Sequence, residues 1–157
     1  SSAASDVYKR QPIAANVIPL CEGFRPDGFS TEEVKLLFET RKILDASIQV
    51  SATCVRVPVF VGHAEAVNIE FDAPISMEEA RTALENADGV VLVDDPANDE
   101  YVTPIDVAGE GGVYVSRVRR DATVEYGLNL WVVSDNLRKG AALNSVQIAE
   151  ALVQDYL

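Results

Sequence analysis

The sequence predicts an α+β fold in which a mixed, largely antiparallel sheet carries helices on one face. Two segments open with serine-capped helical patterns, and several others are rich in β-branched residues or alternate between apolar and polar residues. The predicted elements follow in the order α, β-β, α, β, β-β, α, and paired strands mixed with helices are typical of α+β domains. A chain of 157 residues is long enough for one domain with a sizeable core.

The first predicted helix covers residues 30–44, because Ser30 can cap it and Glu33 occupies the capping-box position. Its apolar residues recur at helical spacing and predict one buried face, formed by Val34, Leu37, Phe38 and Leu44. Residues 47–60 and 63–71 are rich in valine and partly alternate. We expect them to be neighbouring strands separated by a short bend.

The second half of the chain contains the remaining elements. They are a helix at 76–87 with a second capping box, a strand at 89–95, a polar loop at 96–112, strands at 113–121 and 124–135, and a closing helix at 136–157. A tight connection between the last two strands predicts a hairpin. Residues 1–11 show no clear periodicity and resemble a leader or cloning artefact, so the folded domain is expected to cover 12–157.

Composition excludes several classes of function. The formal net charge of −12 argues against a nucleic-acid-binding surface, which needs clustered Lys and Arg. No apolar run approaches the roughly 20 residues of a membrane span, and no secretory signal is evident. Cys21 and Cys54 lack metal-ligand spacing and give no disulfide framework, so a cytoplasmic location is expected. Neither a Gly-rich dinucleotide fingerprint nor a Walker-type loop occurs.

His63, the only histidine, and Arg56 are the first candidates for chemistry. An imidazole titrates near neutral pH and can act as a general acid or base, although a hydrogen-bonded surface or core histidine is the plainer interpretation. The planar guanidinium of Arg56 is suited to bidentate capture of a carboxylate. Alternation along the strand equally allows Arg56 to point into solvent, so the residues alone leave both questions open.

Three further positions have a structural and a functional interpretation. Glu32 and Lys35 share a helix face, either as a surface ion pair or as ligands for an ammonium and a phosphate group. Cys54 is not expected to be a nucleophile, because it lies in an apolar strand and a reactive thiolate needs an electropositive, partly exposed site. Residues 134–144 combine acidic, amide and basic side chains at a helix start, which fits either an anion site or simple capping.

The longest distinctive segments are "FSTEEVKLLFETRKIL" (29–44), "SATCVRVPVFVGHAEAVNIEF" (51–71) and "GLNLWVVSDNLRKGAALNSVQIAE" (127–150). In this order they resemble the C-terminal half of aspartate-semialdehyde dehydrogenases. With the lead-in "PIAANVIPLCEGF", the similarity covers roughly residues 12–155, nearly everything except the leader. Because the motifs are long and ordered, the resemblance is specific.

The resemblance implies a substrate-binding and dimerisation domain like the C-terminal domain of glyceraldehyde-3-phosphate dehydrogenase. It also implies an NADP-dependent oxidoreductase that interconverts L-aspartate 4-semialdehyde plus phosphate and L-aspartyl 4-phosphate. That reaction serves the biosynthesis of lysine, threonine, methionine and, in bacteria, diaminopimelate. Since the family is homo-oligomeric, a homodimer or homotetramer is expected.

Carried over one residue at a time, the resemblance implies five roles. His63 matches the acid/base histidine, and Arg56, seven residues earlier, matches the arginine that binds the substrate carboxylate. Glu32 matches the glutamate that holds the substrate amino group, and Lys35 matches the lysine that helps to bind phosphate. Asn136 falls where the C-terminal segment of the family touches NADP.

The same resemblance places two catalytic parts outside this chain. The nucleophilic cysteine of the family lies in an Asn-Cys-Thr/Ser motif in a preceding nucleotide-binding half, together with the dinucleotide loop, and helix 136–157 would return to that half. We therefore expect the isolated chain to be inactive and to bind NADP weakly. Two alternatives are a non-catalytic dimerisation module of the same fold and an N-acetylglutamyl-phosphate reductase-like enzyme, in which Glu32 would have no ammonium to bind.

Overall fold

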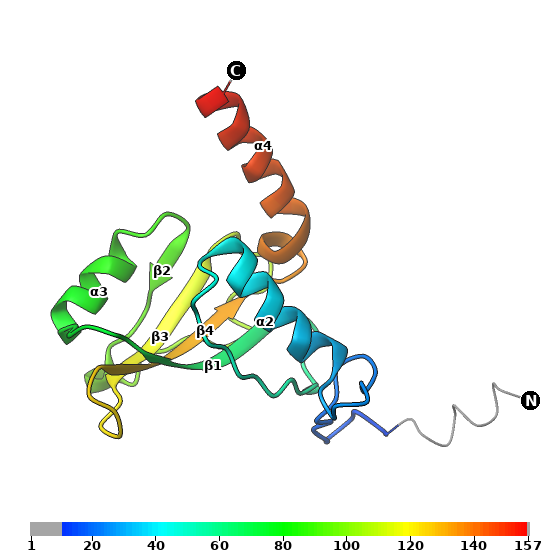
Figure 1. Cartoon of the computed structure of the whole chain (residues 1–157). Helices are drawn as coiled ribbons and strands as arrows, with labels where there is room; N and C mark the ends of the chain where they lie inside the picture. The colour runs from blue at the N-terminus through cyan, green and yellow to red at the C-terminus, as the bar shows by residue number, and fades with distance from the viewer. Residues whose placement is uncertain (1–10, 157) are drawn as a thin grey trace, which may run out of the picture. The chain divides into compact units, whose positions relative to one another are not determined.

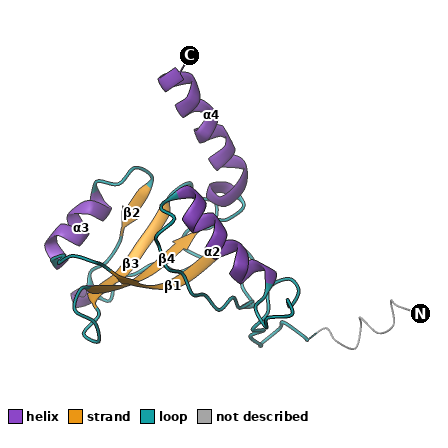
Figure 2. Cartoon of the chain, in the orientation of Figure 1, coloured by secondary structure: helices purple, strands orange, loops and turns teal. Residues whose placement is uncertain are grey.

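A computed structural model describes residues 11–156, which divide into two compact units at Pro58 and Val59. Figure 2 shows the helix of the first unit and the helices and strands of the second. Residues 1–10, which make up most of the expected leader, and Leu157 lie outside the described residues. The assignment of 12–157 to one domain stays a prediction.

Among residues 11–58, the described part of the first unit, there is one helix, α2 (Thr31–Ile43), which has the predicted capping box. The Ser30 backbone N–H donates to Glu33 Oε2 at 2.7 Å, and the Glu33 backbone N–H donates to Ser30 Oγ at 3.3 Å. The prediction of a buried apolar face is wrong within this unit, because Phe38 is 63% and Leu44 72% exposed. The described residues of the first unit form no sheet on which this face could pack.

The prediction of a strand at 47–60 is also wrong. In this range the only ladder contact is an isolated antiparallel bridge between Ile18 and Arg56, with N···O distances of 3.0 and 2.8 Å. A segment with β-rich composition becomes a strand only when a neighbour satisfies its backbone groups along its length. Ile18 supplies such a neighbour at a single position.

The second unit is built on a four-stranded sheet in the order β1-β4-β3-β2 (Figure 1). Its strands are β1 (His63–Glu70), β2 (Val90–Leu92), β3 (Val113–Arg120) and β4 (Gly127–Ser134). The β1/β4 and β3/β4 pairs are antiparallel and the β2/β3 pair is parallel. This confirms the mixed, largely antiparallel α+β fold and the predicted hairpin. The neighbour of β1 is β4, so the expected pairing of this strand with residues 47–60 is wrong.

The helices of the second unit follow the predicted order. Helix α3 (Met77–Glu85) has the second predicted capping box and packs along β2 and β3. A short 3₁₀ turn, η1 (Pro96–Asn98), interrupts the predicted loop. The closing segment starts as a π-helical stretch, η2 (Arg138–Ala142), and continues as α4 (Leu143–Tyr156). In the described part of the chain, no helix is both long and apolar enough to cross a bilayer.

The loop between β2 and β3 covers one face of the sheet and closes the core. Val102 and Val107 from this loop are buried with Val133 of β4, and Trp131 packs against them. Trp131 Nε1 donates to the Val102 carbonyl at 2.9 Å, while the Val102 backbone N–H donates to Ser116 Oγ at 3.1 Å. Apolar burial and these two hydrogen bonds therefore fix the loop on the sheet.

Asp94 joins α3 to an irregular point of β3. Its side chain is 1% exposed and accepts from Arg81 Nη1 at 2.6 Å and from the backbone N–H groups of Arg117 at 2.7 Å and Val118 at 3.2 Å. At this point the β3/β4 register shifts, and Arg117 has a positive φ of 57°. The carboxylate thus satisfies the backbone donors that a β-bulge leaves without a ladder partner.

Replacing Asp94 by Asn should destabilise the second unit. The amide keeps the shape but brings N–H donors toward two backbone donors and removes the charge that pairs with Arg81, so we expect a loss of about 2 kcal/mol in the free energy of unfolding. Urea unfolding measures this loss, with Asp88→Asn as a control for the same charge change at an exposed position. Equal midpoints for the two variants would contradict this role for Asp94.

Candidate active site

His63 opens β1 at the end of the sheet where β4 finishes. The antiparallel register places it opposite Ser134. Gly62, just before it, has a φ of 98°, and a Cβ at Gly62 would lie 3.0 Å from Pro104 Cβ and 3.3 Å from the Pro104 carbonyl oxygen. Only glycine combines this backbone conformation with so close an approach. The Gly-His pair therefore fixes where the imidazole leaves the sheet.

The His63 side chain interacts with a carboxylate on its own strand. His63 Nε2 lies 2.8 Å from Glu65 Oε1, and the two side chains are 56% and 48% exposed. Residues two apart on a strand share one face, which brings the two groups together. The hydrogen bond from the ring is the main cause that holds the pKa of Glu65 below its ordinary value, against a smaller opposing effect of burial.

Asp135 organises the end of β4 that faces the start of β1. It is 4% exposed and accepts from the Gly109 backbone N–H at 2.8 Å and from the Leu137 backbone N–H at 2.9 Å. Arg138 Nη1 also donates to the Gly109 carbonyl. The Gly109 N–H is the largest cause of a pKa of Asp135 below its ordinary value, and desolvation opposes it. Asn136, which follows directly, is exposed at the same end of the sheet as His63.

Glu32, Lys35 and Arg56 all lie in the first unit. Lys35 Nζ is 3.5 Å from Glu32 Oε2, with the Lys35 side chain 51% and the Glu32 side chain 33% exposed, so the structure holds the ion pair that the helical spacing allows. Arg56 is exposed, and its backbone is held by the bridge to Ile18. The guanidinium is therefore accessible to an anionic ligand without a desolvation cost for an unpaired buried charge.

Glu33 connects the helix that carries Glu32 and Lys35 to the segment that carries Arg56. Besides capping α2, it accepts from the Cys54 backbone N–H at 2.9 Å through Oε1. The backbone N–H groups of Ser30 and Cys54 hold the pKa of Glu33 below its ordinary value. Arg41 adds a second connection by donating from Nε to the Ile48 carbonyl at 2.9 Å. The first unit therefore positions the three candidate binding residues as one group.

Comparison with known proteins decides the family. The model of the semialdehyde dehydrogenase dimerisation domain matches residues 1–139. The chain belongs to this family. The resemblance to the C-terminal half of aspartate-semialdehyde dehydrogenases is thereby confirmed.

Similar proteins carry the same description. The chain is 53% identical over 146 residues to an aspartate-semialdehyde dehydrogenase of Aquifex aeolicus, which covers 92% of the chain and 43% of that protein. The structure of aspartate semialdehyde dehydrogenase II from Vibrio cholerae complexed with ASA is 50% identical, with a TM-score of 0.88, over 94% of this chain and 44% of that one.

A more distant solved structure is that of aspartate semialdehyde dehydrogenase with NADP from Candida albicans. It is 28% identical with a TM-score of 0.70 and covers 89% of this chain and 45% of that one. The chain thus spans less than half the length of the relatives that it matches.

Two residues of the site were missed by the sequence analysis. Glu65 could have been found from strand alternation, because it shares a face with His63 two residues earlier. Glu33 was identified as a cap, but its contact with Cys54 spans 21 residues and has no local signal. Between residues 11 and 156, no group of three or more His, Cys, Asp and Glu side chains is arranged to hold a metal ion.

The lowered pKa of Asp135 predicts acid sensitivity of the second unit. A carboxyl whose folded-state pKa lies below its unfolded value stabilises the fold above the unfolded value, about 3.9 for Asp, and this stability is lost as pH falls through the folded value. Asp135→Asn should therefore be less stable than the wild type at neutral pH and lose less stability on acidification. Urea unfolding between about pH 7 and pH 3 tests this.

Asp88→Asn is the matched control for this experiment, since it removes the same charge from an exposed position. Its pH profile should run parallel to that of the wild type. An unchanged profile for Asp135→Asn would show that the contact with Gly109 does not contribute to stability.

Proposed function

We propose that this chain is the C-terminal portion of an NADP-dependent aspartate-semialdehyde dehydrogenase. The reaction converts L-aspartate 4-semialdehyde, phosphate and NADP to L-aspartyl 4-phosphate and NADPH, in the cytoplasm, within lysine, threonine, methionine and diaminopimelate biosynthesis. Identity near 50% to dehydrogenases of this description over more than nine-tenths of the chain is the observation that carries the proposal.

The first unit would bind the substrate. The Arg56 guanidinium pairs with the substrate carboxylate, for which its planar fork is suited, and Glu32 accepts hydrogen bonds from the amino group. Lys35 attracts phosphate as a point charge. These roles are supported by the exposure of Lys35 and Arg56, by the partial exposure of Glu32 and by the connection through Glu33. The Glu32–Lys35 ion pair would open when the ligand's own charges replace it, which costs little for an exposed pair.

The second unit would supply the acid or base. His63 removes a proton from the attacking thiol and then serves proton transfer in the hemithioacetal that forms. Both steps require a group that titrates near neutral pH. That thiol belongs to the half that the relatives possess beyond this chain, and neither Cys54 nor Cys21 replaces it. NADP, when bound, accepts the hydride. The exposed Asn136 amide, which offers both donor and acceptor atoms beside the end of β4, would be suited to contact NADP.

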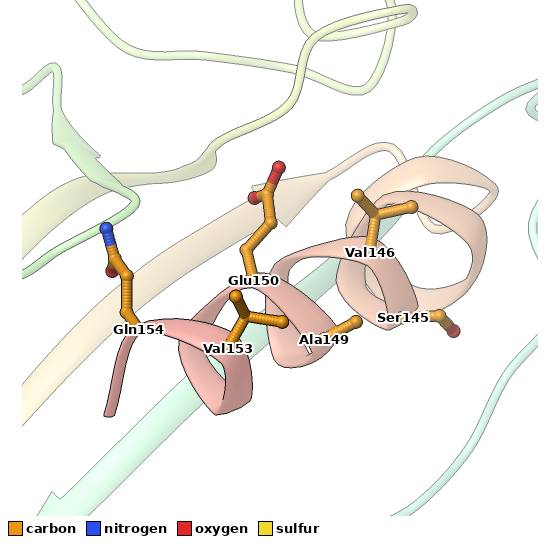
Figure 3. A pocket seen from close by; sticks show the side chains of 6 residues that line it. All are labelled: Ser145, Val146, Ala149, Glu150, Val153 and Gln154. Atoms are coloured by element: carbon orange, nitrogen blue, oxygen red, sulfur yellow. The ribbon is translucent and has the colours of Figure 1, made fainter. Parts of the chain in front are cut away.

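Helix α4 would pack against that same nucleotide-binding half. Figure 3 shows Val146, Ala149 and Val153 along one side of the helix, flanked by Ser145, Glu150 and Gln154. Three further apolar side chains are 52–79% exposed: Ile148, Leu152 and Tyr156. A helix that is apolar around most of its circumference is usually covered. The relatives are more than twice as long as the segment that matches this chain, so they contain enough further residues to cover the helix.

The sheet would form a homodimer, with a homotetramer as the alternative assembly. The description of the family as a dimerisation domain supports this. The proposed contact surface is formed by residues 113–119 of β3 and 128–133 of β4. Several of their apolar residues are already buried within the unit, whereas Leu130 and Val132 remain partly exposed.

The missing half should restore activity. We would join this chain behind the N-terminal portion of the Aquifex aeolicus relative and follow NADP reduction with aspartate semialdehyde and phosphate. The isolated chain should be inactive and the fusion active, and His63→Gln in the fusion should lower kcat about 10²- to 10⁴-fold. Glu70→Gln, at the far end of the same strand, should leave the rate unchanged.

Turnover by the isolated chain would overturn the requirement for a second half. Full activity of the His63→Gln fusion would overturn the role of the histidine.

Replacing Arg56 by Lys in the fusion should raise KM for aspartate semialdehyde about tenfold or more, with a smaller effect on kcat. Lysine keeps the charge but loses the bidentate geometry that holds a carboxylate. Steady-state kinetics measure the changes in KM and kcat separately. Arg25→Lys is the control, because Arg25 is an exposed arginine of the same unit that pairs with Asp27 at 3.5 Å. Equal KM values for both variants would exclude Arg56 from substrate binding.

A further inference from the structure

We propose that Glu65 is a positioning residue that holds the His63 imidazole in one orientation, with a proton at Nε2, and strengthens it as a base. The inference rests on the proposed function of His63 and deepens it, because Glu65 is not among the site residues that the resemblance implies. It concerns a pair of side chains that lies wholly within the second unit.

The backbone makes this contact a fixed feature of β1. Positions 63 and 65 lie on one face of the strand, and β4 holds both through ladder pairs with Ser134 and Val132. At the preceding position, Gly62 and its close approach to Pro104 set where the strand begins. The distance of 2.8 Å between Nε2 and Oε1 is that of a charge-assisted hydrogen bond.

The contact determines which ring nitrogen is basic. A carboxylate only accepts, so Nε2 must carry the proton that lies between it and Glu65. A neutral imidazole with its proton at Nε2 has its basic lone pair at Nδ1, and this atom gains the second proton. A nearby negative charge stabilises the imidazolium that forms. A base oriented by a third group is the general arrangement by which nucleophiles are activated.

Strand β4 supplies the residues that lie opposite the pair in the ladder. Across the strand, β4 faces the pair with Ser134 and Val132, neither of which titrates. The charged residues that follow on that element, Asp135 and Arg138, both hydrogen-bond to Gly109. The lowered pKa of Glu65, whose largest cause is the His63 ring, keeps the carboxylate ionised at neutral pH. Glu65 is thus the anion that β1 supplies to His63.

Nuclear magnetic resonance of the isolated chain tests the pair directly, because His63 is the only histidine and its ring signals need no assignment. We would titrate ¹⁵N- and ¹³C-labelled wild type, Glu65→Gln and Glu65→Ala. Glu65→Gln keeps a hydrogen-bond acceptor but removes the charge, whereas Glu65→Ala removes both. Glu70→Gln and Glu70→Ala are matched controls on the same strand.

Both Glu65 variants should lower the titration midpoint of His63 by about half a pH unit or more, because they remove the anion that favours the imidazolium. Glu65→Ala should also relax the ring from the Nε2–H form toward a mixture of tautomers. The Glu70 variants should change neither quantity. Amide spectra that match the wild type would show that each variant keeps the fold.

If Glu65 and Glu70 variants shift the midpoint equally, only general charge matters and the inference is overturned. The readout needs no enzymatic activity, so it is independent of the proposed function. An inactive wild-type fusion together with a shift specific to Glu65 would reject the dehydrogenase and retain the pair. In an active fusion, Glu65→Gln should lower kcat and move the acid limb of its pH profile, with KM little changed, whereas Glu70→Gln should not.

Discussion

The antiparallel register between β1 and β4 is the constraint on which the second unit's part of the site depends. It places His63 opposite Ser134, and the chain then continues directly into Asp135 and Asn136. Because side chains alternate along a strand, a slip of one residue would move both His63 and Glu65 to the opposite face. The histidine, its carboxylate and the candidate cofactor contact therefore depend on one set of backbone hydrogen bonds.

Buried or capping carboxylates hold the backbone of each unit at places where regular structure is interrupted or ends. Asp94 satisfies the backbone of the bulge in β3, Asp135 holds the loop at Gly109, and Glu33 joins α2 to the segment that carries Arg56. Each carboxylate accepts hydrogen bonds from backbone N–H groups that have no partner in a helix or strand ladder. The acidic composition is thus partly structural, since these carboxylates fix irregular backbone within each unit.

Local chemistry explains what the sequence could predict. Ser30–Glu33 and Ser76–Glu79 define the starts of α2 and α3, and the short connection 121–126 between two strand-like segments indicates the hairpin. The failures at 47–60 and on α2 share a physical reason: both segments have the composition of buried elements but lack a partner along most of their length in the first unit. The contacts of Asp94 with the backbone of β3 and of Glu33 with Cys54 span 21 to 24 residues, a separation at which sequence spacing carries no signal.

The central claim is that this chain contributes the substrate anchor and the proton-transfer group to a site completed by another half. A crystal structure of the fusion protein with aspartate semialdehyde bound tests it most directly. The account predicts that the Arg56 guanidinium pairs with the ligand carboxylate and that the His63 ring lies within hydrogen-bond distance of the cysteine of the added half. A ligand carboxylate that does not contact Arg56, together with a His63 ring far from that cysteine, would contradict it.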